Sequence, residues 1–255
     1  NEAGGTANYA STLRSRAVET VSDDSRHYSL SEDVNGDGAF DRVTLRTIET
    51  NGVTNSSVTE RSASGALQSR VETWTSANGL LTIQSVDADG NGVYETKNWD
   101  STVLWADGSV WRTLFSFAAD GTLFRVQGTT TSDDGTSVVT AFDDDGDGRI
   151  DLWKYRSVTL AANGVTTAVA TSLAASVQKI FQDTLVTSAD KRSVVRTVDE
   201  NGDGVADWSV NTVTGNDGVT TATTSYFSRA NGALQARISV ATSQDGLSRF
   251  ESRDW

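Results

Sequence analysis

The sequence predicts an all-β protein in which tandem four-stranded antiparallel repeats follow one another in a continuous meander that curls into a spiral or solenoid. Three observations predict this fold. Four nine-residue acidic segments begin 54, 56 and 56 residues apart, pairs of turn-forming residues recur every 13 or 14 residues between them, and the 255 residues include no Pro. In a meander all strands but the first and last are central, where Pro would remove a hydrogen bond of the ladder.

The strands are expected between the turn signals, in segments of about nine or ten residues rich in Thr, Val, Ser and aromatic residues. Two strands precede the first acidic segment, four lie in each of the three intervals and four follow the last segment, which gives about 18. Each Asn-Gly or Asp-Gly pair predicts a tight type I′ hairpin with two residues of positive φ. The clearest pairs are Asn51-Gly52, Asn78-Gly79, Asp107-Gly108, Asp120-Gly121, Asp134-Gly135, Asp217-Gly218, Asn231-Gly232 and Asp245-Gly246.

The third interval keeps this spacing although its turn residues differ. Asn163-Gly164 is followed by Ala174-Ala175-Ser176 and then by Asp190-Lys191, where Gly-containing pairs stand in the other intervals. The segment from Ser172 to Ile180 is the nearest to a helical pattern, but its place in the interval predicts strand.

The whole chain is expected to form one repeat array, because no shift in composition and no Pro/Gly/Ser-rich linker divides it. Asn1 to Thr6 are expected to be a loose end. Since the sequence has no Met, even at its first position, we expect it to be a segment of a longer product. Within residues 1–255 the predicted units are 1–41 (a partial repeat), 42–95, 96–151, 152–207 and 208–255.

The acidic segments have the pattern of calcium loops. Each carries oxygen-bearing side chains at its first, third, fifth and ninth positions and Gly at its sixth. Calcium takes about six to eight oxygen ligands, and Gly at the sixth position permits the sharp turn that directs the carbonyl of the seventh residue toward the ion. Four copies therefore predict about four Ca²⁺ ions. The predicted ligand residues are Asp33, Asn35, Asp37, Ala39, Asp41, Asp87, Asp89, Asn91, Val93, Glu95, Asp143, Asp145, Asp147, Arg149, Asp151, Asp199, Asn201, Asp203, Val205 and Asp207.

The composition excludes several classes of site. There is no Cys, which excludes disulfides and thiolate-bound metals, and the only His is His27, which we expect on the surface of a strand. The net charge of −13 opposes binding to nucleic acid or to an anionic membrane, and no segment is long and apolar enough to be a membrane helix. The predicted ligands include 13 carboxylates, so four Ca²⁺ would bring the charge to about −5.

The acidic segments resemble those of known repeats. A segment followed directly by a strand, as in Asp147-Gly-Arg-Ile-Asp-Leu-Trp153, resembles the calcium loops of FG-GAP and VCBS-type repeats, over the four segments and the strands beside them. The Thr-rich strands with Asn-Gly and Asp-Gly turns resemble the repeat arrays of bacterial RTX-type adhesins, although the RTX nonapeptide Gly-Gly-x-Gly-x-Asp is absent. The first resemblance implies a β-propeller with four-stranded blades as the alternative fold, and the second implies export by a type I system.

These observations predict a calcium-binding structural repeat region of a large secreted bacterial surface protein or adhesin, outside the cell, rigidified by Ca²⁺ and in contact with neighbouring repeats of its parent chain. The alternative is a glycan-binding, lectin-like propeller that holds several Trp residues in a concave site. Trp99, Trp105 and Trp111 are expected instead to fill gaps in a thin core. We expect no catalytic residues; a secreted hydrolase that uses a carboxylate pair is the remaining class.

Overall fold

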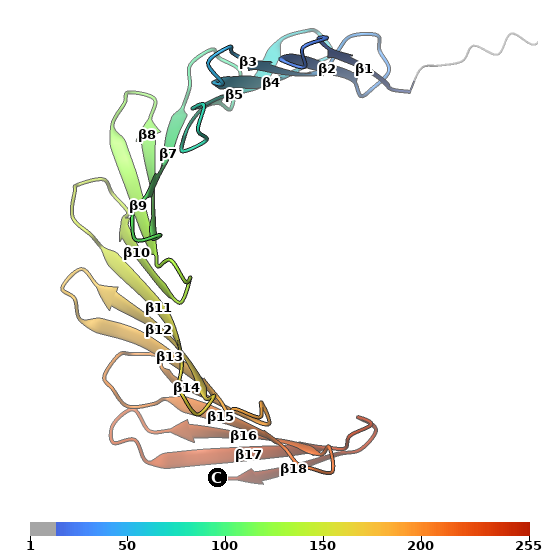
Figure 1. Cartoon of the computed structure of the whole chain (residues 1–255). Coiled ribbons are helices and arrows are strands. Elements are labelled where there is room, and N and C mark those ends of the chain that lie inside the picture. The colour runs from blue at the N-terminus through green and yellow to red at the C-terminus, as the bar shows by residue number, and fades with distance from the viewer. Residues whose placement is uncertain (1–13) are drawn as a thin grey trace, which may run out of the picture. The chain divides into compact units, whose positions relative to one another are not determined.

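The computed structural model describes residues 14–255, so the loose end predicted at Asn1 to Thr6 lies outside the described residues. All regular elements in this part of the chain are β-strands, and Figure 1 labels them in chain order. The strands are β1 (Arg16–Val21), β2 (His27–Asp33), β3 (Arg42–Ile48), β4 (Thr54–Arg61), β5 (Leu67–Thr75), β6 (Leu81–Asp87), β7 (Thr96–Leu104), β8 (Val110–Ala118), β9 (Leu123–Thr131), β10 (Ser137–Asp143), β11 (Leu152–Leu160), β12 (Thr166–Ala174), β13 (Lys179–Thr187), β14 (Ser193–Asp199), β15 (Trp208–Thr214), β16 (Thr220–Phe227), β17 (Leu234–Thr242) and β18 (Arg249–Asp254).

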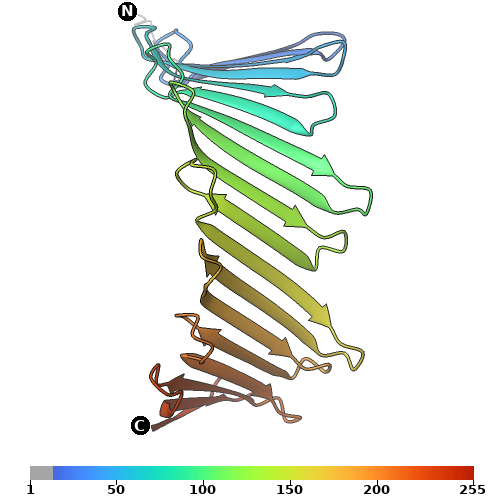
Figure 2. The ribbon, with the colours of Figure 1, turned by 90° about the vertical axis from the view of Figure 1, so that its left-hand side faces the viewer.

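The 18 strands belong to a single sheet, and each pairs antiparallel with its neighbours in the chain. The chain divides into two compact units, and within each of them successive strands run in opposite directions, as Figure 2 shows. The prediction of an all-β antiparallel meander is therefore confirmed, including the number of strands. The alternative of a β-propeller is wrong, because its blades would be separate sheets. Curling of the meander into a spiral or solenoid stays a prediction.

The short hairpins differ from the predicted type I′ turns, in which both central residues have positive φ. In the pair Asn51-Gly52 only Gly52 has it, at 88°. The Gly52 amide donates to the Glu49 carbonyl (2.9 Å) and the Glu49 amide donates to the Val53 carbonyl (2.8 Å), which defines a three-residue loop with a type I turn and a glycine bulge. The Asn51 side chain accepts the Val53 amide (3.0 Å), so Asn stabilises this turn by hydrogen bonding rather than by a left-handed backbone.

A second kind of hairpin begins with Ser and encloses four residues. The Ser132 amide donates to the Ser137 carbonyl (2.9 Å), the Ser132 hydroxyl donates to Asp134 (2.7 Å), and the Ser137 amide donates back to the Ser132 hydroxyl (2.9 Å). The same three contacts recur in the hairpins that begin at Ser22, Ser76, Ser188 and Ser243. The turn signals thus locate the hairpins correctly, and the Ser hydroxyl adds contacts that the Asn-Gly and Asp-Gly pairs do not indicate.

Two hairpins of the third interval form without Gly. Val177 and Lys191 take the left-handed conformation there, with φ of 64° and 59°. The stretch from Ser172 to Ile180 forms the end of β12, a turn and the start of β13. It is therefore not helical, and the prediction of strand is correct for its two ends only.

The sheet has almost no hydrophobic core. Among the described residues, Val198 and Ala236 are the only buried hydrophobic side chains. The expectation that Trp99, Trp105 and Trp111 fill gaps in a core is wrong: they are 39%, 44% and 42% exposed, since a single sheet offers no second layer to cover them.

His27 is exposed at the first position of β2, as expected.

The chain divides into two compact units, one formed by the described part of Asn1–Thr102 with Leu114–Phe124 and the other by Val103–Thr113 with Arg125–Trp255. The division falls within β7, β8 and β9 and leaves each acidic loop inside one unit. Within residues 14–255, no helix is long and apolar enough to cross a membrane.

Candidate metal centre

Each acidic loop connects two neighbouring strands, and its first Asp is the last residue of the strand before it. The loops join β2 to β3, β6 to β7, β10 to β11 and β14 to β15. The first Asp is buried in all four, with exposures of 0% at Asp33, 1% at Asp87, 2% at Asp143 and 6% at Asp199. A buried carboxylate must be hydrogen-bonded or paired with a cation, so the contacts of these four residues define what the loops can do.

Two backbone amides hold the first Asp of each loop. In the loop 87–95, the Gly90 amide donates to Asp87 Oδ1 (2.8 Å) and the Gly92 amide donates to Asp87 Oδ2 (3.0 Å). The glycines at the fourth and sixth positions of the other three loops make the same two bonds. The repeated Gly-x-Gly spacing therefore wraps the backbone around a buried carboxylate.

The glycine at the fourth position has a role that the sequence pattern did not reveal. Gly90 has a φ of 73°, and a Cβ atom on it would lie 2.2 Å from the Leu67 carbonyl oxygen of the adjacent strand β5. Gly202 has a φ of 75°, and its Cβ would lie 2.1 Å from the Lys179 carbonyl oxygen on β13. The loop thus packs directly on a neighbouring backbone, a contact between residues far apart in the chain.

The acid at the ninth position closes the loop. Glu95 Oε2 accepts the amide of Ala88 (2.6 Å), and Asp41, Asp151 and Asp207 accept the amide at the same place in their loops. The ninth-position acid therefore has a structural role in the loop besides that of a predicted ligand.

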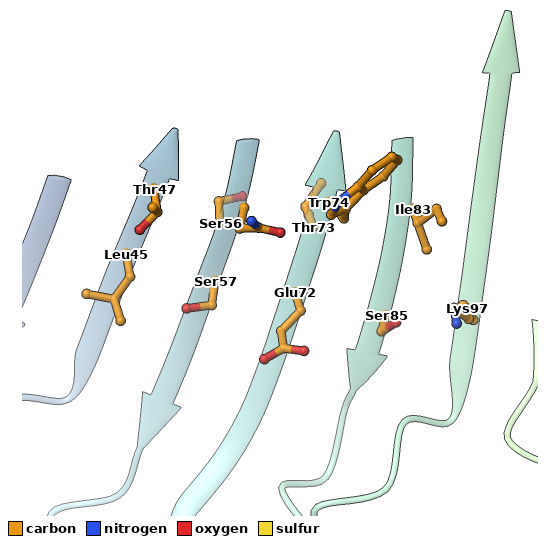
Figure 3. Close-up of a pocket in the computed structure, with 11 residues that line it drawn as sticks. Leu45, Thr47, Ser56, Ser57, Glu72, Thr73, Trp74, Ile83, Ser85 and Lys97 are labelled. Atoms are coloured by element: carbon orange, nitrogen blue, oxygen red, sulfur yellow. The ribbon is translucent and has the colours of Figure 1, made fainter. Parts of the chain in front are cut away.

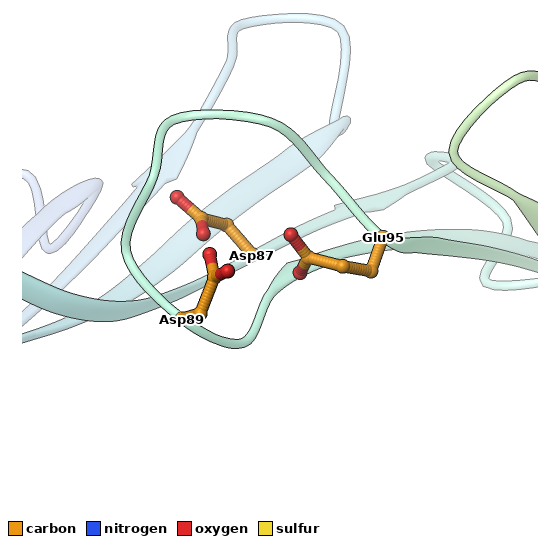
Figure 4. A group of neighbouring side chains, drawn as sticks. All are labelled: Asp87, Asp89 and Glu95. Atoms are coloured by element: carbon orange, nitrogen blue, oxygen red, sulfur yellow. The ribbon is translucent and has the colours of Figure 1, made fainter.

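In two loops the carboxylates at the first, third and ninth positions converge, and Figure 4 shows the first of these groups. Ligand atoms of Asp87, Asp89 and Glu95 lie within 4.8 Å of one another, and the same holds for Asp143, Asp145 and Asp151. Each group can hold a metal ion. In the first group, Glu95 Oε1 is buried and has no hydrogen-bond partner.

The other two loops carry Asn at the third position, which removes one carboxylate from the group. In the loop 33–41, the side-chain amide of Asn35 donates to Asp41 Oδ1 (3.2 Å). In the loop 199–207, the side-chain amide of Asn201 donates to Asp203 (3.1 Å).

The loop 199–207 also contacts two basic side chains. Lys179 Nζ lies 3.0 Å from Asp199 Oδ2, and Arg229 lies 2.7 Å from both Asp207 Oδ1 and Glu200 Oε2. Burial acts to raise the pKa of Asp199, but the Lys179 ammonium and the amides of the two loop glycines outweigh it and hold that pKa below its usual value. The bond to Asp207 raises the pKa of Arg229.

The remaining predicted ligand residues make contacts within their own loops. The side-chain oxygens at the fifth position cap the amide at the seventh, as where Asn91 accepts the Val93 amide (2.7 Å). Asp37, Asp147 and Asp203 do the same for Ala39, Arg149 and Val205. Coordination by the fifth-position side chains and by the seventh-position carbonyls stays a prediction.

A hollow on the sheet lies beside the loop 87–95 (Figure 3). Its side chains include a row across β3 to β7 that the register sets: Leu45, Ser57, Glu72, Ser85 and Lys97. The small Ser residues on either side of Glu72 create the space.

Tyr94, at the eighth position of the loop 87–95, ties the loop to the sheet. Arg70 lies over its ring at 5.5 Å and also pairs with Glu72. Burial and the neighbouring Glu72 carboxylate raise the pKa of Tyr94 to about 12, so this hydroxyl keeps its proton at a pH where an ordinary tyrosine ionises.

Comparison with known proteins does not name this arrangement. No protein-family model matches the chain, and no curated protein matches it in sequence. The resemblance to FG-GAP, VCBS and RTX-type repeats therefore rests on the acidic loops and the hairpin pattern alone.

Proposed function

We propose that the chain is a calcium-binding structural region of a large secreted bacterial surface protein or adhesin, in which the acidic loops bind Ca²⁺ and stiffen a sheet built of four-stranded repeats. The observation that carries this proposal is the group of Asp87, Asp89 and Glu95. Three carboxylates converge there, and one oxygen atom of the group, Glu95 Oε1, is buried without a hydrogen-bond partner.

The electrostatics of such a group favour a bound cation. Two ionised carboxylates 4.8 Å apart repel each other by about 3 kcal/mol at an effective dielectric constant of about 20. A divalent cation among them converts this repulsion into attraction and supplies the partner that the buried oxygen atom lacks. The loop therefore fits a metal ion better than it fits three unliganded acids.

The chemistry of the donors points to calcium. All the available side-chain ligands are oxygen atoms, which suits Ca²⁺ and Mg²⁺ and disfavours zinc and copper. Mg²⁺ demands near-ideal octahedral geometry and keeps several waters, whereas Ca²⁺ accepts a larger and more flexible oxygen shell. The fifth-position side chain and the seventh-position carbonyl are available to complete such a shell.

The affinity expected for a calcium loop of this kind suits a location outside the cell. Extracellular calcium modules bind with dissociation constants on the order of 10⁻⁴ to 10⁻³ M. Loops of that affinity stay unoccupied at cytosolic calcium and fill after export, which supports secretion and agrees with the type I route implied by the RTX resemblance.

Calorimetric titration with Ca²⁺ tests the proposal. The expected result is binding at 87–95 and 143–151 and weaker binding at 33–41, where the Asn35 amide first has to leave Asp41. The variant Asp145→Asn is expected to weaken binding at its loop at least tenfold.

The matched control for this titration is Asp144→Asn, which makes the same change of charge one residue away. The Asp144 side chain pairs with Arg125 (3.2 Å) and is not part of the group of carboxylates. Equal loss of affinity in both variants would mean that only the general negative charge of the loop attracts calcium.

A second candidate function, sugar binding, is favoured by the exposed aromatic side chains. Trp105 and Trp111 lie 6.2 Å apart between ring centroids, and both present part of the ring to solvent. Binding on a glycan array that is lost in Trp111→Ala would support it, and an array without bound sugars would count against it.

A further inference from the structure

The loop 199–207 differs from the others because basic side chains occupy places that hold apolar residues elsewhere. Lys179 and Leu67 are equivalent positions, since the carbonyl of each packs against the fourth-position glycine of its loop. Both also lie next to a β-bulge in their strand pair. In the loop 143–151 the corresponding residue is Leu123, because it precedes the first Asp of its loop by as many residues as Leu67 and Lys179 precede theirs. Lys179 therefore stands where two of the other loops have Leu, and it places an ammonium group on the buried first aspartate.

Arg229 is the second basic residue at a position that is apolar in another loop. The Phe227 amide donates to the Asp207 carbonyl (2.8 Å), just as the Arg61 amide donates to the Asp41 carbonyl (2.7 Å). This shared bond makes Arg229 equivalent to Ala63. The guanidinium reaches both Asp207 and Glu200 at 2.7 Å.

We propose that Lys179 and Arg229 are built-in cations of the loop 199–207, so that this loop keeps its conformation without calcium while the loops 87–95 and 143–151 require the ion. The proposal rests on the proposed function and refines it, because it specifies which loops respond to calcium. The chain then contains one permanently ordered loop and at least two loops that calcium orders.

The contacts explain why the two kinds of cation exclude each other. Lys179 Nζ occupies a position 3.0 Å from an oxygen atom of the buried first aspartate, and Gln182 Oε1 accepts a further bond from it (2.9 Å). A Ca²⁺ ion bound to Asp199 would lie within a few ångströms of this ammonium group and would be repelled by it. Asp207, the closing acid, is likewise engaged by Arg229.

The loop also offers a local probe. Trp208 follows the ninth position directly, and its indole Nε1 donates to Glu200 (3.0 Å). Excitation of this indole sensitises the luminescence of Tb³⁺, an analogue of Ca²⁺, only when the ion is bound close by. Emission lost in Trp208→Phe therefore reports on this loop rather than on the others.

The experiment compares the wild type with Lys179→Leu/Arg229→Ala, which gives the loop the residues found at the equivalent positions. The variant is expected to bind one more Ca²⁺ than the wild type by calorimetry. Its Trp208-dependent Tb³⁺ emission is expected to appear at a Tb³⁺ concentration at least tenfold lower than in the wild type. The reciprocal variant Leu67→Lys is expected to bind one Ca²⁺ fewer. Arg237→Leu, which removes an exposed positive charge from β17, is the control and is expected to behave as the wild type.

Hydrogen exchange of the wild type gives a readout that needs no variant. After chelation of calcium, the amides of Gly90, Gly92, Gly146 and Gly148 are expected to exchange at least tenfold faster. Those of Gly202 and Gly204 are expected to keep their rates.

Two failures are distinguishable. If the wild type binds no Ca²⁺ at any loop, the proposed function is overturned and this inference with it. If the wild type binds Ca²⁺ at 199–207 as tightly as at 87–95, or if the folded double variant gains no ion, this inference alone is overturned and calcium binding stands.

Discussion

The left-handed residues show where single positions of this chain carry strain. Ser25, Val177 and Lys191 are the non-glycine residues with positive φ among those described, and they stand where the other hairpins have Gly. A β-branched side chain such as that of Val177 is the least suited to this conformation, because its Cβ crowds the following carbonyl oxygen. The backbone of the hairpin, fixed by two paired strands, overrides the preference of the residue.

The first prediction concerns this strain. Val177→Gly is expected to stabilise the folded chain by about 1 kcal/mol, because relief of the left-handed strain exceeds the entropy that Gly adds to the unfolded chain. Urea unfolding measures the change. Ala175→Gly, in the same turn but without positive φ, is the control and is expected to be neutral or destabilising. Equal effects would show that Val177 is not strained.

The second prediction separates two reasons for glycine within one acidic loop. Gly90 and Gly92 both have positive φ, but a Cβ at Gly90 would meet the Leu67 backbone while one at Gly92 would meet nothing within 4 Å. Gly92→Ala is expected to cost about 1 kcal/mol from conformation alone. Gly90→Ala is expected to cost at least about 2 kcal/mol more and to lower the calcium affinity of the loop. Unfolding curves and calorimetry of the two variants make the comparison.

At the scale of elements, the Ser-initiated hairpins act as units held by hydrogen bonds to an Asp or Asn side chain. The Thr136 amide and the Ser132 and Thr136 hydroxyls donate to Asp134 and hold its pKa below 3.8. Asp190 and Asp245 are held in the same way, mainly by Ser188 and Ser243. Each of these three hairpins is thus stabilised by an ionised carboxylate that stays exposed.

The third prediction follows from the sign of these shifts. The folded form binds fewer protons than the unfolded form near pH 4, so the hairpins contribute stability above the ordinary Asp pKa and lose it as the pH falls through the lowered folded value. Ser132→Ala is expected to raise the pKa of Asp134 toward 3.8. NMR titration of the side-chain carboxyl measures it, with Asp120, whose hairpin has no such Ser, as the internal control. An unchanged midpoint for Asp134 would contradict the assignment.

At the scale of the molecule, stability comes from the ladder and from ionic contacts rather than from a core. With two buried hydrophobic side chains among the described residues, the sheet cannot depend on apolar burial as a layered domain does. The net charge of −13 adds repulsion that bound cations relieve.

The fourth prediction is that chelation lowers the melting temperature of the whole chain. At a calcium concentration 100-fold above its dissociation constant, each site adds about 2.7 kcal/mol to the free energy of unfolding. Thermal unfolding followed by circular dichroism measures the shift, with the ionic strength held constant by NaCl so that general screening makes no difference. A melting temperature that is equal with and without calcium would remove the structural role proposed for the loops.

The fold was predictable to a large extent because its signals are local. Hairpin residues every 13 or 14 positions and the lack of Pro locate strands without knowledge of their partners, and a meander pairs each strand with its chain neighbour. The type of turn was not predictable from the pairs alone, because Asn51 and its equivalents act through the side chain.

The sequence by itself determined an all-β meander with four acidic loops between strands, since turn residues and oxygen ligands at fixed spacing act within a few residues of one another. The residue at the third position, Asp or Asn, already separates the loops that gather three carboxylates from the others. Only the tertiary structure decided which loop carries its own cations. Lys179 and Arg229 lie some 20 residues from the acids that they contact, across neighbouring strands. Strand register brings them together, and register depends on the pairing of the whole sheet rather than on the loop pattern.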